Sequence, residues 1–140
     1  MARFQKLLIP VDLSDRGHTA LEWLPRLGES ETRSLLLHVI ETLDDVPFEE
    51  MEDFYEGLEA RAGDVLDGWV EELGRQGIPA ERRVVFGHRL QEILRAAEEE
   101  APDLLLLASH PVEPDTPGRG WATLSYRLAV LAPCPVLLAK

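Results

Sequence analysis

Leu104-Leu105-Leu106-Leu107-Ala108-Ser109 is a short apolar run, and its length and composition predict a buried strand of a parallel sheet. A polar loop rich in Pro and Gly follows it, and the pattern predicts a short amphipathic helix over residues 122–131. A strand that leads through a loop into a helix N-terminus is how α/β proteins hold phosphate groups on backbone N–H groups. This order of elements predicts an α/β protein with a ligand crevice beside the loop.

The loop lacks glycine where such loops normally need it. Glycine lets the backbone approach a ligand closely or adopt a positive φ. Here the strand ends on Ala108, the loop opens on Pro111, and Ala122 precedes the first hydroxyl of the helix. Pro111 also has no N–H to donate to a phosphate. The sequence therefore predicts the frame of a phosphate site without its usual backbone chemistry.

The rest of the chain alternates between apolar runs and helical patterns. Strands are expected over residues 4–11, 34–40, 80–86, 103–109 and 135–139, and helices over 20–27, 52–74, 90–100 and 122–131. Pro25 is expected to kink the first helix or end it early, with Gly28 as its stop. The strand over 80–86 alternates in polarity and is expected to be more exposed than the others. Strands separated by helices require right-handed crossovers.

We therefore predict one domain over residues 1–140, a doubly wound, Rossmann-like α/β fold. Its five-stranded parallel sheet has helices on both faces and the strand order 3-2-1-4-5. Ligands of such sheets bind beyond the carboxyl ends of the strands, where the strand order reverses. The first and fourth strands border that crevice, so Asp12 and the segment 108–110 are expected at its edge.

Charge and cysteine content exclude several classes of protein. The net charge of −12 argues against nucleic acid and against anionic membranes as partners. The acidic segment 44–52 is either a partner surface or a solvated connection. One cysteine, Cys134, allows no internal disulfide and no cysteine cluster for zinc, and it is typical of a reducing cytoplasm. No apolar run reaches the roughly 20 residues of a membrane span. We expect a cytoplasmic protein.

Four segments in order resemble the universal stress protein family, and the likeness covers nearly the whole chain. Residues 7–14 resemble the family's opening "ILVPVDGS", except that Leu13 replaces glycine, and residues 36–40 resemble its "LLHV". Gly87, the segment 92–94 and the segment 101–105 are similar to its "G…EEIL…ADLIV". Residues 132–138 are similar to its ending "APCPVLVV".

Nucleotide-binding members of that family carry Gly, two residues, Gly, nine residues, then Gly and Ser or Thr. Aligned from the APCPV end, Ala108 and Pro111 fall on the first two glycines and Ala122-Thr123 on the final pair. The interval before Ala122 is also one residue too long. The hydroxyl is retained and all three glycines are missing, while Glu113 and Asp115 add negative charge to the loop.

The resemblance implies a nucleotide crevice with Asp12 and Val39 at the adenine and ribose end. Thr123, Ser125 and Arg119 are the groups that would attract an anion. Asp12 has a second interpretation as the N-cap of the first helix, Thr123 and Ser125 as caps of the last, and Arg119 as a solvated loop residue. The candidate site comprises Pro10, Val11, Asp12, Val39, Ser109, Arg119, Thr123 and Ser125.

Three functions remain open. The first is a universal stress protein that binds neither ATP nor another cofactor and acts as a homodimeric regulatory or interaction module with an unidentified protein partner. The resemblance implies dimerisation through the C-terminal strand, whose apolar residues 136–138 suit an exposed sheet edge. The second is a member that binds ATP or another adenine nucleotide through a diverged loop.

The third is an enzyme acting on adenine nucleotides, which we do not expect, because no nucleophile–base pair, metal cluster or phosphate-activating Lys is visible. We assign His110 no catalytic role. Either binding function would be contradicted if Trp121 or Tyr126 filled the crevice.

Overall fold

The computed structural model describes residues 2–14, 17–109 and 123–140. Five parallel strands form one sheet in the order β3-β2-β1-β4-β5. This arrangement confirms the predicted fold and strand order. The strands are β1 (Lys6–Pro10), β2 (Arg33–Glu41), β3 (Ala80–Gly87), β4 (Leu104–Ala108) and β5 (Val136–Ala139). The helices are α1 (Gly17–Leu27), η1 (Phe48–Met51, a 3-10 turn), α2 (Glu52–Arg75), α3 (Arg89–Glu100) and α5 (Leu124–Leu131).

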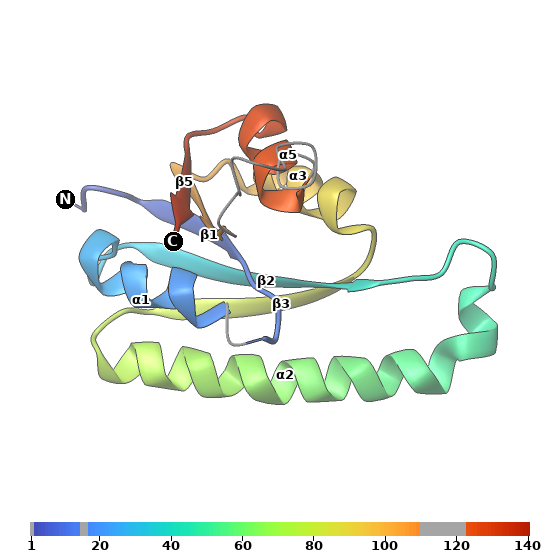
Figure 1. Cartoon of the computed structure of the whole chain (residues 1–140). Coiled ribbons are helices and arrows are strands. Elements are labelled where there is room, and N and C mark those ends of the chain that lie inside the picture. The colour runs from blue at the N-terminus through green and yellow to red at the C-terminus, as the bar shows by residue number, and fades with distance from the viewer. Residues whose placement is uncertain (1, 15–16, 110–122) are drawn as a thin grey trace.

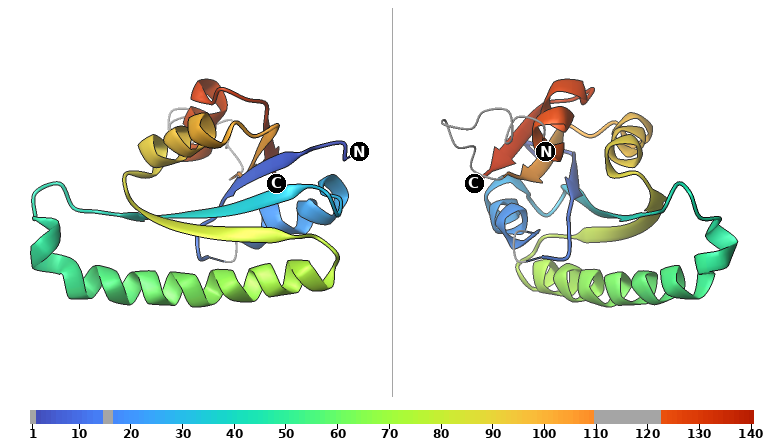
Figure 2. Two further views of the ribbon diagram at one scale, coloured as in Figure 1. Left: turned by 180° about the vertical axis from the view of Figure 1, so that it is seen from behind. Right: turned by 45° about the vertical axis from the view of Figure 1, so that its right-hand side comes forward.

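Two apolar layers cover the two faces of the sheet, because successive side chains of a strand point to opposite faces. On one face, α1 and α2 pack on residues such as Leu7, Ile9 and Leu106. On the other face, α3 and α5 pack on residues such as Leu8 and Leu105. Figures 1 and 2 show α2 running along one side of the sheet and α3 with α5 on the opposite side. The crevice described below opens on the α3 and α5 side.

The central strands are buried and the edge strand β3 is not. Seven consecutive residues of β2 are buried, whereas none of β3 is. The sequence predicted this difference from the alternating polarity of β3. At the end of β3, Gly87 has a φ of +146°, and a Cβ there would lie 2.8 Å from Cγ of Glu92. Gly87 is thus required where the chain passes from β3 into α3.

The prediction for Pro25 was wrong in one respect. α1 continues through Pro25 to Leu27, and its end is marked by Gly28, whose N–H donates to the Leu24 carbonyl at 2.6 Å. Pro25 is exposed and lies in the last turn. Proline has no N–H, so at this position it removes one intrahelical hydrogen bond. The loss is small because only a few more such bonds follow before the helix ends.

None of the residues 44–52 is buried, so the segment is solvated as expected of a connection, and side-chain contacts also hold it. It contains η1, whose Phe48 ring stacks on Tyr55 with centroids 5.0 Å apart. The Tyr55 hydroxyl accepts from the N–H of Leu43 at 3.1 Å, and His88 Nε2 lies 2.7 Å from Oδ1 of Asp44. Side-chain packing therefore holds this segment, and its use as a partner surface stays a hypothesis.

Candidate functional site

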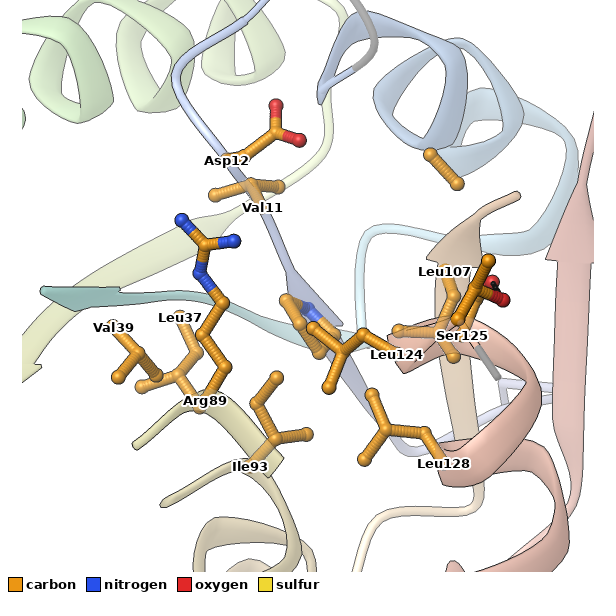
Figure 3. A pocket seen from close by; sticks show the side chains of 13 residues that line it. Val11, Asp12, Leu37, Val39, Arg89, Ile93, Leu107, Leu124, Ser125 and Leu128 are labelled. Atoms are coloured by element: carbon orange, nitrogen blue, oxygen red, sulfur yellow. Dashed lines mark hydrogen bonds between the residues drawn. The ribbon is translucent and has the colours of Figure 1, made fainter. Parts of the chain in front are cut away.

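A cavity of about 320 Å³ lies beyond the carboxyl ends of β1 and β4, where the strand order reverses (Figure 3). This is the position that the topology predicts for a ligand. Its walls come from β1, β2, β4, α3 and α5. The residues that line it are Pro10, Val11, Asp12, Leu37, Val39, Arg89, Ile93, Leu107, Ala108, Thr123, Leu124, Ser125 and Leu128. Six of the eight predicted site residues are among them.

The floor of the crevice is fixed by two hydrogen bonds of Val11. Its N–H donates to the Leu37 carbonyl at 2.8 Å, which extends the β1–β2 pairing past the last residue of β1. Its carbonyl oxygen lies 2.8 Å from Nδ1 of His38, so the His38 ring donates there. Both Val11 and His38 are buried, and a buried backbone group needs a partner. His38 is therefore a structural residue of β2 that holds the first strand's exit in place.

Asp12 stands at the rim with its carboxylate in a short local turn. Oδ1 of Asp12 accepts from the N–H of Ser14 at 3.0 Å and from the Ser14 hydroxyl. Leu13 and Ser14 form a bend and the described part of α1 begins at Gly17, whereas an N-cap residue immediately precedes its helix. The alternative role of Asp12 as N-cap of the first helix is therefore wrong. The turn instead orients the carboxylate at the mouth of the cavity (Figure 3).

The two hydroxyl groups of the last helix have mixed roles. Thr123 is the N-cap of α5, and its Oγ1 accepts from the N–H of Tyr126 at 3.4 Å. The same Oγ1 lies 3.3 Å from the hydroxyl of Ser125. The capping role of Thr123 is confirmed, and both side chains still line the cavity. Because the two hydroxyl groups already take part in these hydrogen bonds, they have fewer free donor and acceptor positions for a ligand.

Two predicted site residues are not in the described cavity. Ser109 follows β4, but its hydroxyl accepts from Nζ of Lys140 at 3.1 Å, at the end of β5. Arg119 lies outside the described residues, as do His110, Trp121 and the three loop positions 111, 113 and 115. Tyr126 does not line the cavity and is 46% exposed, so it does not block it.

Sequence reasoning missed Arg89, the first residue of α3. It is the only cation among the described residues that line the cavity. Figure 3 shows its side chain extending from α3 toward Val11. Its Nε lies 3.3 Å from Oε1 of Glu41, and both side chains are about half exposed, at 50% and 51%. The only sequence signal was its place directly after Gly87-His88, at the end of a strand.

The chemistry of the cavity is that of a binding pocket with an apolar interior and a polar rim. The interior is formed by Leu37, Val39, Ile93, Leu107, Leu124 and Leu128. The rim carries one carboxylate, one guanidinium and two hydroxyls. Such a pocket suits a flat apolar group with hydrogen-bonding substituents at its edge.

Two further observations concern other chemistry. In the described part of the chain, no three His, Cys, Asp or Glu side chains converge where they would hold a metal ion. Burial raises the pKa of the Cys134 thiol, and this side chain packs against the core on the α3 side.

Among the described helices, none is long and apolar enough to span a bilayer.

The sequence profile of the universal stress protein family matches residues 3–140. The chain belongs to the universal stress protein family. No curated protein matches it by sequence. Among solved structures it is similar to a universal stress protein UspA from Lactobacillus plantarum, with 19% identity, a TM-score of 0.80 and 100% of both chains covered.

Two other similar structures are described with a nucleotide. One is a universal stress protein family protein from Arabidopsis thaliana with AMP bound, with 22% identity, a TM-score of 0.70, and coverage of 97% of this chain and 91% of that one. The other is a universal stress protein in complex with cAMP, with 16% identity, a TM-score of 0.74, and coverage of 98% and 97%. At these identities the likeness shows the shared fold.

Proposed function

We propose that this chain is a homodimeric regulatory module of its family that does not bind ATP and whose crevice takes an adenine nucleoside or nucleoside monophosphate. The observation that carries the proposal is the open cavity of about 320 Å³ formed by residues predicted for a nucleotide crevice. Ligand pockets range over about 300–1,000 Å³. A cavity at the lower end of that range suits a base and a ribose better than a triphosphate.

The polar groups at the rim fit a nucleoside. The Asp12 carboxylate accepts hydrogen bonds, which a ribose donates through its two hydroxyls. Val39 and the neighbouring apolar side chains offer the flat base a dry surface. The structures described with AMP and with cAMP show that proteins of this fold hold such ligands, which supports the same ligand class here.

A triphosphate is disfavoured by the loop sequence. Backbone N–H groups are the usual donors to a phosphate chain, and Pro111 has none. The acids Glu113 and Asp115 would repel a triphosphate. At the end of the loop that the structure describes, the Thr123 hydroxyl already accepts a hydrogen bond from the Tyr126 N–H of α5. These features support a ligand with at most one phosphate.

The other parts of the proposal concern the role of the protein. We propose a binding module of the cytoplasm rather than an enzyme.

The proposed self-association surface is the outer edge of β5 together with Val130 and Leu131 of α5. These two side chains are 66% and 55% exposed. Among the residues that the structure describes, β5 pairs with β4 alone, so its other edge could pair with a second copy. A nucleotide bound in the crevice would then act as a signal to a partner protein.

Calorimetric titration of protein stripped of nucleotide tests the ligand. We expect adenosine and AMP to bind with dissociation constants in the micromolar range, about −8 kcal/mol, and ATP to bind no more tightly than AMP with or without Mg²⁺. Asp12→Ala should weaken both by about tenfold, and Asp64→Ala, an exposed acid of α2, should change neither. Tighter binding of ATP than of AMP would instead favour a nucleotide site with a diverged phosphate loop. No binding of any of the three would refute the proposed ligand.

A further inference from the structure

Three large apolar side chains are exposed where the chain passes from β2 into α2. Leu43, Phe48 and Phe54 are 53%, 41% and 54% exposed. They come from the segment after β2, from η1 and from the first turn of α2. Figures 1 and 2 show η1 and the start of α2 projecting past the end of the sheet. We call these three residues the apolar tip.

One buried residue, Tyr55, holds the apolar tip together. Its ring stacks on that of Phe48 with centroids 5.0 Å apart, and its centroid lies 5.8 Å from that of Phe54. Its hydroxyl accepts from the N–H of Leu43 at 3.1 Å. Phe86 of β3 completes the cluster, with its ring 5.4 Å from Phe48 and 5.9 Å from Tyr55. The three exposed residues are thus gathered around one anchor on the end of the sheet.

A gathered apolar surface differs from scattered exposed residues. A single exposed apolar side chain is normal on a folded protein. Several of them held together and ringed by polar groups mark a surface that another molecule covers. The ring contacts with Tyr55 and Phe86 also restrict how Phe48 can move, so little order has to be gained when a partner binds.

The charge around the apolar tip selects the kind of partner. Residues 44–56 contain no lysine or arginine, and their acids are all exposed: Asp44, Asp45, Glu49, Glu50, Glu52, Asp53 and Glu56. Among the residues that the structure describes, only Asp44 of these acids has an ion-pair partner, the ring of His88. A surface of this charge repels a second copy of itself and attracts a cationic segment.

Arginine suits this surface better than lysine does. A guanidinium group stacks on the face of an aromatic ring, and it also binds a carboxylate through two parallel hydrogen bonds. The apolar tip offers the rings of Phe48 and Phe54, with Glu49, Glu50 and Asp53 next to them in the chain. Both kinds of contact are therefore available to one arginine-bearing partner.

We propose that the apolar tip is a docking surface for a partner protein that presents an arginine-rich amphipathic helix. The apolar stripe of that helix covers Leu43 and Phe54, and its guanidinium groups bind the flanking carboxylates. The inference rests on the interaction role in the proposed function, whose partner it defines by chemistry, and it does not require a nucleotide in the crevice. The tip lies by β3, at the sheet edge opposite β5, so self-association through β5 leaves it accessible.

The test measures binding of a labelled peptide to the intact protein by fluorescence anisotropy. The probe is a synthetic amphipathic helix of about 18 residues, with leucine on one face and arginine on the other. We expect saturable binding, which Phe54→Ser and Leu43→Ser should each weaken about tenfold. Val65→Ser, which changes an exposed apolar residue further along α2, should leave it unchanged. Thermal unfolding of each variant checks that the protein has folded.

A second pair of variants tests the charge. Glu49→Gln combined with Glu50→Gln should weaken peptide binding about threefold at low ionic strength. The matched control is Glu98→Gln combined with Glu99→Gln, which removes the same charge from exposed positions of α3 and should have no effect. Equal weakening by the two pairs would show that only the net charge matters, and the docking surface would be refuted.

Three other outcomes would overturn the proposal. The first is the absence of saturable binding, and the second is equally tight binding of a peptide whose leucines are replaced by serine. The third is a loss of self-association in Phe54→Ser, measured by sedimentation equilibrium, because the tip would then contact a second copy. None of these outcomes bears on the calorimetric titration of the crevice, so the docking surface and the proposed ligand fail separately.

Discussion

Nδ1 of His38 lies 2.8 Å from the carbonyl oxygen of Val11. This bond joins the middle of β2 to the chain just after β1 and so fixes the residue that precedes Asp12. Because both residues are buried, no water molecule is at hand to take the place of His38 at the Val11 carbonyl. The geometry of the crevice rim thus depends on a side chain that does not line the crevice.

Replacing His38 by Leu should lower the free energy of unfolding by about 1–3 kcal/mol, because the Val11 carbonyl is left buried without a partner. Urea unfolding followed by circular dichroism measures this. His88→Gln is the control, since the His88 side chain is 42% exposed and, within the described part of the chain, its ring pairs with the exposed Asp44. A His38→Leu variant as stable as the intact protein would show that the bond is not required.

Glu100 should make the stability of the protein depend on acid pH. Lys6 and Arg83 both donate to its carboxylate and hold its pKa at about 2, below its ordinary value of 4.5. Since the pKa is lower in the folded state, the stabilisation is complete above pH 4.5 and is lost as the pH falls from 4.5 to about 2.

Glu100→Gln should therefore destabilise the protein at pH 7 by about 1–3 kcal/mol and flatten the loss of stability between pH 4.5 and 2. Urea midpoints at pH 7, 4.5, 3 and 2 would give both quantities. Glu99→Gln, its exposed neighbour, should leave the profile unchanged. A Glu100→Gln profile as steep as that of the intact protein would contradict the assignment.

Two glycines of α2 should be replaceable with a gain in stability. A Cβ at Gly57 or Gly68 would have no atom within 4 Å, and both lie inside the helix. Gly57→Ala and Gly68→Ala should each raise the free energy of unfolding by about 0.5–1 kcal/mol, because alanine restricts the unfolded chain.

Gly77 is the matched control for these substitutions, since a Cβ there also meets open space but its φ is +81°. Gly77→Ala should destabilise the protein by about 1 kcal/mol or more. If all three alanine variants changed stability in the same direction, backbone conformation would not be the deciding factor.

Self-association should appear as twice the chain mass of 15.7 kDa in sedimentation equilibrium. Val130→Asp should shift the protein toward the monomer, because Val130 is 66% exposed beside the proposed interface on α5. Val65→Asp changes an exposed residue of α2 on the other face of the sheet and should keep the dimer. A monomeric intact protein at high micromolar concentration would refute the proposed dimer.

Several site residues could be predicted from the sequence because their positions follow from local pattern. Val11 and Asp12 directly follow the buried strand β1, and Thr123 immediately precedes α5, so parallel topology alone brings them to one edge of the sheet. The same reasoning predicted Ser109 for the crevice, but Ser109 is not among the residues that line the described cavity. Ser109 bonds Lys140 because β5 pairs beside β4, and that neighbour cannot be read from the residues around Ser109.

The amino-acid sequence by itself determined the alternation of strands and helices, the crevice at the reversal of strand order, and the absence of the loop glycines. The periodicity of apolar residues and the chemistry of Gly and Pro carry that information locally. Only the tertiary structure decided that His38 anchors Val11 and that Arg89 lines the crevice. These relationships depend on how α3 packs beside α5 across the sheet, and side-chain direction in such packing is set by contacts between distant segments.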